Sequence, residues 1–440
     1  MSQASDWVLQ RLIWSALDQN EQRAALARPL ADQNQALAES VADIIRQVRE
    51  NGDQALREYA RRFDQVTLDS LVADTAAIER PDADTEAVLL ALDQAIERLR
   101  RFHAAGRPVD YKVETAPGVV CSARYVPLQR VGLYIPAGSA PLISTLIMLA
   151  IPAQLAGCDD IVLCSPPQAD GEISSLVLAA AQRVGINRVY RCGGAQAIAA
   201  MAFGTASIPR CDKIFGPGNR WVTEAKRQVA AATDGTAIDM PAGPSEVMVI
   251  ADAQADPHRV AIDLLSQAEH GPDSQVLLVT DSAALVDQVE ASLKRWLLLL
   301  PRADVARQAL GHSRAIVVKD ANTALTVANA YAPEHLILQT TDAELMSQRV
   351  TCAGSVFIGP WTPESLGDYC SGTNHVLPTS GWARSHSGLS LIDFMRRITF
   401  QQATAAGLAQ IGSVAETLAA SEGLDAHRLA VSYRLGSVFP

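Results

Sequence analysis

The chain has 440 residues, more than the roughly 100 to 200 residues of an ordinary domain, so we expect two large units or several smaller ones. Its composition, 48% hydrophobic and 19% charged, is typical of a globular enzyme and excludes a disordered or fibrous chain. The formal net charge of -11 argues against nucleic acid as a partner, because binding a phosphate backbone requires clustered Lys and Arg.

The sequence shows no sign of export or of a membrane partner. The opening segment MSQASDWVLQRLIW lacks the pattern of a secretory signal and is expected to begin an amphipathic helix. The most apolar run, residues 142–155, is broken by Pro152 and is shorter than the roughly 18 to 20 residues that span a bilayer. The seven cysteines lack CxxC spacing and predict neither disulfides nor a thiolate zinc site. We therefore expect a cytoplasmic protein.

The N-terminal part is predicted to be helical. Apolar residues follow helical spacing in segments such as 36–63 and 87–102, which are rich in Ala, Leu and paired charges. After Pro108 the pattern changes to short β-branched runs separated by Gly and Pro, which is typical of strands that alternate with helices in a parallel sheet. We assign residues 1–115 to a mainly helical N-terminal region.

Two similar α/β lobes are predicted to follow. In the first, residues 116–243, the strands lie in RVGLYIPAG, DDIVLCSPP, RVYRCGG and CDKIFGPGN, and helices follow them. In the second, residues 244–388, the strands lie in EVMVIAD, QVLLVTD, AIVVKD, HLILQT and GSVFIG. The last part, residues 389–440, is predicted to return to helix and to form an arm. The expected fold class is α/β with parallel sheets.

Three Gly- or Pro-containing turns in the first lobe suit a pyrophosphate group. They are YIPAG at 134–138, GGAQA at 193–197 and GPGN at 216–219. Glycine lets the backbone approach an anion closely, and the amides at a helix N-terminus favour negative charge. None of the turns matches GxGxxG, so ordinary tight turns between strand and helix remain the alternative interpretation.

The second lobe carries two pairs of chemically active side chains. Gln267 and His270 in SQAEH share one face of a predicted helix, and together they could contribute to a metal site without completing one. Glu334 and His335 in PEH place a carboxyl and an imidazole side by side after a proline. Imidazole suits proton abstraction from an alcohol, and a carboxylate can activate water for oxidation of an aldehyde. By sequence alone, PEH could equally be the first turn of a helix.

A long polar and Gly-rich stretch, residues 364–388, is predicted to be functional, because long loops within a compact body usually are. It and the segment after it offer Asp368, His375 and Asp393 as candidate metal ligands. Glu422 and His427 lie on the C-terminal arm, and we expect that arm to dock on a partner. The histidines without a companion ligand are expected at the surface, namely His103, His258, His312 and His386.

Taken in order, these segments resemble the histidinol dehydrogenase family over nearly the whole chain. The segments that match are VGLYIPAG, GGAQAIAAMAFGT, KIFGPGN, DMPAGPSEV, QAEHGPDSQ, NAYAPEHL, SLGDYCSGTNHVLPT and EGLDAH. The resemblance implies two incomplete Rossmann-like lobes with smaller helical parts, in a homodimer whose active sites are shared through the C-terminal arm. It further implies one zinc ion per subunit and two successive NAD-dependent oxidations, from L-histidinol through L-histidinal to L-histidine.

The resemblance also assigns roles to individual positions. The implied zinc ligands are Gln267, His270, Asp368 and His427, the last one donated by the neighbouring subunit. The implied NAD contacts are Tyr134, Gln196 and Asn219. The implied substrate contacts are Ser245, Gln267, His270, His335, Asp368, Glu422 and His427. In this scheme zinc orients and polarises the substrate.

Our mechanistic hypothesis gives the two PEH side chains separate steps. His335 takes the hydroxyl proton in the alcohol step, and Glu334 activates water in the aldehyde step. The rival is a thiohemiacetal on a cysteine, for which Cys121 or Cys158 is the nearest option, although no sequence feature marks either thiol as activated.

Two alternative functions stay open at the level of sequence. A zinc- and NAD-dependent dehydrogenase of the same family could act on another primary alcohol, such as a sulfonated propanediol. A non-catalytic binding or scaffold protein could keep the fold without needing every ligand. Reduction of NAD with histidinol would exclude the second alternative.

Overall fold

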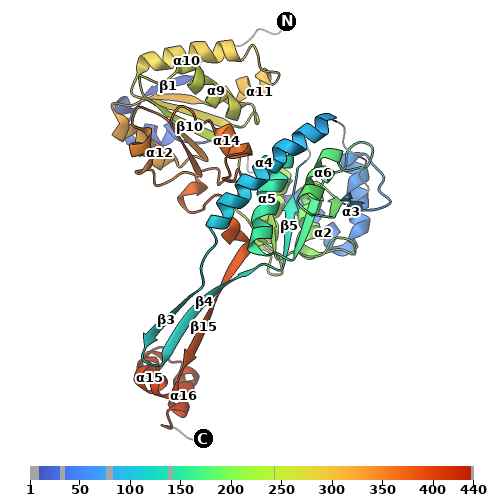
Figure 1. The fold of residues 1–440 in the computed structure, drawn as a ribbon, viewed down its shortest axis with the longest axis vertical. Helices are drawn as coiled ribbons and strands as arrows, with labels where there is room; N and C mark the ends of the chain where they lie inside the picture. The colour runs from blue at the N-terminus through green and yellow to red at the C-terminus, as the bar shows by residue number, and fades with distance from the viewer. Residues whose placement is uncertain (1–8, 30–34, 76–82, 137–141, 242, 438–440) are drawn as a thin grey trace.

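The computed structural model describes residues 9–29, 35–75, 83–136, 142–241 and 243–437. Two α/β lobes lie next to each other, and a narrow arm projects away from them (Figure 1). Each lobe is built on a six-stranded sheet, and the arm is built on a three-stranded one. Among the described residues, no helix is long and apolar enough to cross a bilayer.

The sheet of the first lobe is parallel except at one edge. Its strand order is β2 (Val72–Asp74), β7 (Arg188–Arg191), β6 (Asp160–Ser165), β5 (Arg130–Tyr134), β8 (Lys213–Phe215) and β9 (Ala237–Ile238). Only β2 runs antiparallel to its neighbour. The helices of this lobe are α2 (Gln35–Asn51), α3 (Asp53–Tyr59), α4 (Ala83–Ala105), α5 (Ile143–Ala156), α6 (Ser175–Arg183), α7 (Gly194–Phe203) and α8 (Arg220–Ala231).

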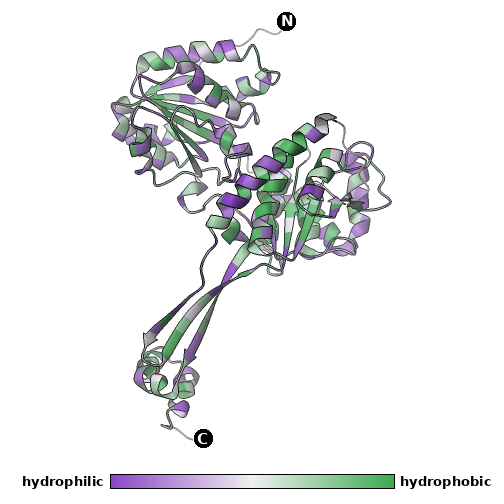
Figure 2. Ribbon diagram, in the orientation of Figure 1, coloured by the Kyte–Doolittle hydropathy of each residue, from purple (hydrophilic) through white to green (hydrophobic). Residues whose placement is uncertain are grey.

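Helix α5 is the centre of the first lobe's core. It is apolar on all sides, as Figure 2 shows, and it is buried between the sheet and helices α4 and α6. The C-terminal end of α5 is set by Gly157, whose φ of +95° continues the chain in the left-handed region. This helix therefore holds the sheet and helices α4 and α6 together in one core.

The sheet of the second lobe is parallel throughout its neighbouring pairs. Its strand order is β1 (Gln10–Ile13), β12 (Arg314–Val317), β11 (Gln275–Thr280), β10 (Glu246–Ala251), β13 (His335–Gln339) and β14 (Ser355–Ile358). The central strands are buried along their whole length, which is why their sequences are continuous apolar runs. The helices are α9 (Pro257–Ala268), α10 (Ala283–Trp296), α11 (Ala303–Leu310), α12 (Ala321–Tyr331), α13 (Ala343–Ser347) and α14 (Glu364–Tyr369).

The arm joins two segments that are distant in the sequence. Its antiparallel sheet has the order β15 (Met395–Ala403), β4 (Val119–Pro127) and β3 (Tyr111–Ala116), and Met395 pairs with Pro127. Helices α15 (Ala405–Ser421) and α16 (Asp425–Arg434) cover the far end (Figure 1). The remaining short elements are α1 (Gln19–Ala25), η1 (Trp14–Ala16), η2 (Ala60–Asp64), η4 (Trp382–Arg384) and η5 (Leu391–Phe394).

The sequence-based expectations differ from the structure at both ends of the chain. Residues 10–13, expected to be helical, form strand β1 at the edge of the second sheet, whereas residues 1–8 lie outside the described part. Residues 395–403, also expected to be helical, form strand β15, because antiparallel pairing with β4 is available to this β-branched and aromatic segment. From Ala405 onward the arm is helical, as predicted.

The predicted N-terminal region is distributed between the lobes. Strand β1 extends the second sheet, whereas α2 packs on α7 and α8 of the first lobe and α4 packs on α5 and α6. The domain boundaries that we drew from the sequence therefore stay an interpretation. One expectation inside this region is wrong: His103 on α4 is only 3% exposed rather than at the surface.

Candidate active site

The candidate site lies where two parallel strands of the second lobe begin. Strand β10 starts at Glu246 and strand β13 at His335, and the register pairs Val247 with His335. Glu246 and Glu334 therefore stand side by side at the amino-terminal edge of the sheet. Open α/β sheets usually bind ligands at the opposite, carboxyl-terminal edge.

Glu334 is a buried carboxylate with one backbone donor. Its Oε2 accepts a hydrogen bond of 2.9 Å from the N–H of Glu246, and the side chain lies 3.7 Å from Nδ1 of His335. Burial raises the pKa of Glu334 to about 8, because the charged form is poorly solvated, although His335 and the Glu246 N–H lower it in part. A carboxyl with a pKa near neutrality can exchange protons at physiological pH.

His335 is held between a backbone carbonyl and a carboxylate. Its Nδ1 lies 3.3 Å from the carbonyl oxygen of Glu246, and its Nε2 lies 3.4 Å from Oδ1 of Asp368. The carbonyl can only accept, so Nδ1 carries a proton and Nε2 faces the site. Burial alone would lower the pKa of His335, but the carboxylates of Glu334 and Asp368 outweigh it and raise the pKa to about 10.

Two of the predicted metal ligands, His270 and Asp368, interact electrostatically with His335, and a third, Gln267, lies one helical turn before His270. Gln267 on α9 is 1% exposed, and neither atom of its amide has a hydrogen-bond partner within the described structure. His270 lies just after the same helix and is exposed, and its charge interacts with those of Asp368 and His335. Buried amide groups without partners are rare, so this one points to a ligand that satisfies it.

The fourth predicted ligand does not reach this cluster in the single chain. His427 and the predicted substrate contact Glu422 are exposed at the far end of the arm, remote from both lobes (Figure 1). In the described part of the chain, no three His, Cys, Asp or Glu side chains gather to hold a metal ion. One subunit thus offers His270, Asp368 and the Gln267 amide, and a four-ligand zinc site needs a donor from elsewhere.

The side chains of two further candidate ligands are engaged in hydrogen bonds to the protein itself. His375 uses both ring nitrogens, with Nδ1 2.9 Å from the carbonyl oxygen of Asp368 and Nε2 3.0 Å from Oγ1 of Thr145 on α5. It thereby holds the Asp368 backbone against the first lobe. Asp393 accepts a bond of 2.8 Å from the N–H of Ser390 and caps the short helix before β15. The expectation that these two side chains bind metal is not supported.

Sequence reasoning missed three ionisable residues near the site. Glu364 lies one turn before Asp368 on α14 and is 1% exposed, and its Oε1 accepts a hydrogen bond of 2.6 Å from Oγ of Ser266. Burial raises the pKa of Glu364 to about 7. Its four-residue spacing from Asp368 was the only signal that could have found it. Glu246 and Arg28, discussed below, gave no such signal.

The predicted cofactor residues sit on the turns at the carboxyl ends of the first lobe's strands. Oη of Tyr134 accepts a bond of 3.1 Å from the N–H of Gly194, which joins two of the turns. Gln196 is buried in the first turn of α7, and Asn219 caps α8 by accepting from Trp221 N–H at 3.0 Å. Positions 137 and 138 of the first turn lie outside the described residues.

The close approach of these turns depends on one glycine. Gly216 has a φ of +124°, and a Cβ there would lie 2.2 Å from the carbonyl oxygen of Tyr134. No other residue fits, because both the backbone conformation and the contact exclude a side chain. The turns are thus packed together at one edge of the sheet, where backbone amides face outward from helix N-termini.

The thiol alternative finds no support in the geometry. Cys158 donates toward the carbonyl oxygen of Phe394 at 3.7 Å, and burial raises the pKa of its thiol to about 12. Cys121 lies on β4 in the arm, next to Thr115. A nucleophilic thiol needs a lowered pKa beside the reacting carbon, and neither cysteine is near Glu334 and His335.

Two parallel α/β lobes, one with glycine-containing turns at helix N-termini and one with buried acid and base groups, are compatible with a nicotinamide-dependent oxidoreductase. The comparisons with known proteins agree with this class. The family model described as histidinol dehydrogenase matches residues 27–435. The chain belongs to the histidinol dehydrogenase family and is an NAD-dependent oxidoreductase.

Individual relatives match over nearly their full lengths. Histidinol dehydrogenase of Xanthomonas campestris pv. campestris (strain 8004) is 55% identical over 97% of this chain and 99% of the relative. That of Xylella fastidiosa (strain Temecula1) is 54% identical over 96% and 98%. A crystal structure of histidinol dehydrogenase from Elizabethkingia anophelis superposes with a TM-score of 0.91 at 43% identity, over 98% of both chains.

Proposed function

We propose that this protein oxidises L-histidinol through L-histidinal to L-histidine, the last steps of histidine biosynthesis, with two molecules of NAD as hydride acceptors. The observation that carries the proposal is the buried Glu334–His335 pair beside Asp368, in a chain that matches the family from residue 27 to 435. One base and one water-activating group are what a sequential oxidation of an alcohol and then an aldehyde requires.

His335 is the proposed base of the first step. The carbonyl of Glu246 holds the proton on Nδ1, so the lone pair of neutral His335 is on Nε2, which faces the site. Nε2 takes the proton of the substrate hydroxyl while the carbinol carbon transfers hydride to NAD. The products of this step are the aldehyde, NADH and protonated His335.

Glu334 is the proposed base of the second step. Its carboxylate takes a proton from water as the water oxygen adds to the aldehyde carbon. The hydrate then transfers hydride to a second NAD and leaves as the carboxylic acid. The raised pKa of Glu334, about 8, makes its ionised form a stronger base than an exposed carboxylate.

Gln267, His270 and Asp368 are proposed to hold zinc, together with His427 from a second copy of the chain. The partnerless amide of Gln267 and the oxygen and nitrogen donors of the set fit this ion. When bound, zinc would supply positive charge that binds the substrate's nitrogen atoms and offsets the carboxylates that keep His335 protonated. Ser245, which immediately precedes β10, would contact the substrate together with the ligands, His335 and Glu422.

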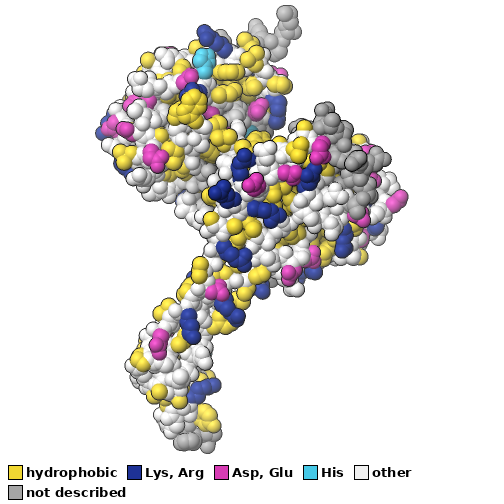
Figure 3. Space-filling model, in the orientation of Figure 1, with side chains coloured by type: hydrophobic (Ala, Val, Ile, Leu, Met, Phe, Trp, Pro, Cys, Tyr) yellow, Lys and Arg dark blue, Asp and Glu magenta, His cyan; other side chains and the backbone are white. Residues whose placement is uncertain are grey.

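The arm is proposed to form a homodimer with shared active sites. Its surface carries many exposed apolar side chains, some visible in Figure 3, and a monomer rarely leaves so many in contact with water. They include Tyr111, Val113, Phe400, Ile411, Val414, Leu418, Leu424 and Tyr433. Docking of the arm on a second copy would bury them and bring Glu422 and His427 to a site that one chain leaves incomplete.

NAD is proposed to bind at the first lobe, against Tyr134, Gln196 and Asn219. The turns that carry these residues present helix N-termini to the same side of the sheet, which suits a pyrophosphate. The amide of Gln196 is buried beside the bend at Gly194, and Asn219 begins α8.

One assay tests the proposal as a whole. Metal-replete and chelator-stripped protein is incubated with L-histidinol and NAD, and NADH is counted per histidine formed. We expect two NADH per histidine and loss of turnover after chelation. A family member acting on another primary alcohol would give no NADH with histidinol, and either that result or unchanged turnover without metal would contradict the proposal.

A further inference from the structure

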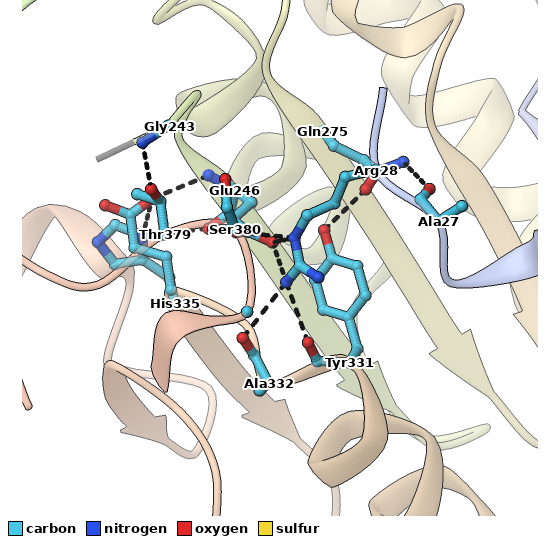
Figure 4. A network of polar contacts seen from close by, with 12 residues as sticks. Ala27, Arg28, Gly243, Glu246, Gln275, Tyr331, Ala332, His335, Thr379 and Ser380 are labelled. Carbon is cyan, nitrogen blue, oxygen red and sulfur yellow. Dashed lines mark hydrogen bonds and ion pairs between the residues drawn. The ribbon is translucent and has the colours of Figure 1, made fainter. Parts of the chain in front are cut away.

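Arg28 reaches from the N-terminal segment into the second lobe beside the catalytic pair (Figure 4). Its Nε lies 2.9 Å from Oε2 of Glu246, and its Nη2 donates to the carbonyl oxygens of Tyr331 at 3.0 Å and Ala332 at 3.3 Å. The guanidinium also stacks 3.9 Å above the centre of the Tyr331 ring. One planar group therefore satisfies a carboxylate, two carbonyls and an aromatic face, which an ammonium group could not do.

The carbonyl oxygens bound by Arg28 end the helix that leads to Glu334. Helix α12 stops at Tyr331, and Ala332 follows with a φ of +55°. A left-handed conformation at a residue other than glycine is strained and persists only where the surroundings impose it. Arg28 binds this turn directly, since its positive charge and its donors meet the carbonyl end of the helix two residues before Glu334.

Glu246 carries the second connection from Arg28 to the catalytic pair. The backbone of Glu246 contacts both side chains, with its N–H donating to Oε2 of Glu334 and its carbonyl facing Nδ1 of His335. The carboxylate of Glu246 also accepts from the N–H of Ser380, another residue in the left-handed region. The position of Glu246 therefore sets the orientation of both catalytic groups at once.

We propose that Arg28 is a positioning residue for the Glu334–His335 pair. Through Glu246 and through the end of α12, it holds the carboxyl and the imidazole in the orientation that both oxidation steps use. The inference rests on the proposed function of these two side chains. Arg28 itself touches neither of them and takes no part in the chemistry.

The burial of the ion pair makes this connection stiff. The side chain of Glu246 is 2% exposed and that of Arg28 is 20% exposed. A carboxylate this deeply buried cannot turn toward water when its partner changes. Loss of the planar guanidinium of Arg28 would therefore shift Glu246 or Ala332. A shift of about an ångström at a reacting group can cost up to about a hundredfold in rate.

Arg314, on β12, offers a matched control because it binds the same N-terminal segment that carries Arg28. It donates to the carbonyl oxygens of Ala25 and Ala27 at 2.5 and 3.0 Å, so it anchors the N-terminal segment from β12. Within the described structure, Arg314 donates no hydrogen bond to Glu246, Tyr331 or Ala332, although its charge interacts with the hydroxyl of Tyr331. Arg314→Lys therefore loosens the segment that carries Arg28 while leaving the catalytic pair in place.

The test compares Arg28→Lys with Arg314→Lys in the zinc-loaded full-length protein. L-histidinol and L-histidinal are oxidised separately, and NADH binding is measured by fluorescence. For Arg28→Lys we expect kcat to fall about tenfold in both steps, with KM and the NADH Kd changed less than about twofold. For Arg314→Lys we expect kcat within about twofold of the parent protein. Equal effects of the two substitutions would overturn the inference.

A double-mutant cycle separates failure of the inference from failure of the proposed function. In a Glu334→Gln background, Arg28→Lys should lose most of its effect on histidinal oxidation, because the group that it positions is gone. If Glu334→Gln oxidises histidinal normally, the proposed function fails. If Glu334→Gln is impaired and the effects of the two substitutions simply multiply, the positioning role fails.

A fold control accompanies these measurements. If Arg28→Lys lowers the Tm, the pair Arg28→Gln with Glu246→Gln removes both buried charges together and is assayed in its place. This pair keeps polar groups of similar size but lacks the planar fork that binds the end of α12. We again expect kcat to fall in both steps, and unchanged kcat would overturn the inference.

Discussion

The two lobes share a parallel sheet flanked by helices, but they present their chemistry at opposite edges. The first lobe gathers backbone turns at the carboxyl ends of its strands, where Gly194 and Gly216 allow close packing. The second lobe gathers buried ionisable side chains at the amino-terminal ends of β10 and β13. In the proposed function, the first lobe therefore serves the cofactor through its backbone turns, and the second lobe serves the reaction through its side chains.

Two buried histidines, one in each lobe, show how differently the two lobes affect the pKa of the same side chain. His103 in the first lobe has no partner for its Nε2 within the described structure, and burial lowers its pKa to about 4. His335 in the second lobe is as deeply buried, but neighbouring carboxylates raise its pKa to about 10. The same side chain is thus a neutral packing group in one lobe and an exchangeable proton carrier in the other.

The largest expected effect concerns the side-chain chemistry of the second lobe. For His335→Asn we expect the rate of histidinol oxidation to fall about a thousandfold, because the proposed base of the alcohol step is lost. Single-turnover NADH formation measures the rate, and NADH fluorescence titration measures cofactor binding, which should stay unchanged. His258→Asn, at an exposed position, is the control. Weakened cofactor binding in His335→Asn would show that the lobes are not independent.

Subunit mixing tests whether the second lobe's site is completed by another chain. His335→Asn and His427→Ala proteins should each be nearly inactive, since each lacks a group of the shared site. When they are dissociated together and reassociated, half of the dimers combine one subunit of each kind and regain one intact site. We expect about a quarter of the parent activity. If no activity returned after reassociation had been verified, His427 would act in the site of its own subunit or would lie outside the active site.

A glycine substitution addresses the backbone site of the first lobe. In Gly216→Ala the new Cβ would meet the Tyr134 carbonyl, so we expect the Kd for NADH to rise about tenfold and stability to fall by about 3 kcal/mol. Gly359→Ala is the control, because its φ of +82° carries a similar conformational cost in open space. Equal losses of NADH affinity in the two variants would argue against a cofactor site at this turn.

The smallest expected effect is a change in how stability depends on pH. The pKa of His103 is lowered to about 4 in the folded chain, so its stabilising contribution is present above the unfolded value of 6.5 and is lost as the pH falls toward 4. In His103→Leu, the decrease in unfolding free energy between pH 7 and pH 5 should be about 2 kcal/mol smaller. Urea unfolding at both pH values measures it, and an unchanged decrease would mean that His103 is protonated when folded.

Much of the sheet architecture could be predicted from local sequence. Apolar runs such as VGLY and VLLV are bounded by turn residues, and the structure confirms them as β5 and β11. Strands β1 and β15 could not be predicted, because each depends on a distant partner. Gln10 pairs with Arg314, and Phe400 pairs with Ser122. Their pairing is a tertiary effect that no short window contains.

The site residues that are neighbours in the sequence could be predicted, whereas those that are distant from one another in the sequence could not. The PEH motif and the spacing of Gln267 and His270 suggested chemistry, and the family resemblance supplied the roles. Arg28 gave no signal, since its bonds to Glu246 and Tyr331 span 218 and 303 positions. Glu246 gave no signal for another reason. It is the first residue of an apolar strand, and the sequence pattern does not indicate a separate role for it.

Glu334 and His335 are proposed to divide the two oxidation steps between them. The most direct measurement gives Glu334→Gln protein L-histidinol and L-histidinal in separate single-turnover reactions and follows NADH formation in each. The account predicts that histidinol oxidation stays within a few-fold of the parent rate while histidinal oxidation falls at least about a hundredfold. Equal rates for histidinal in the variant and the parent protein, or equal losses in both steps, would contradict it.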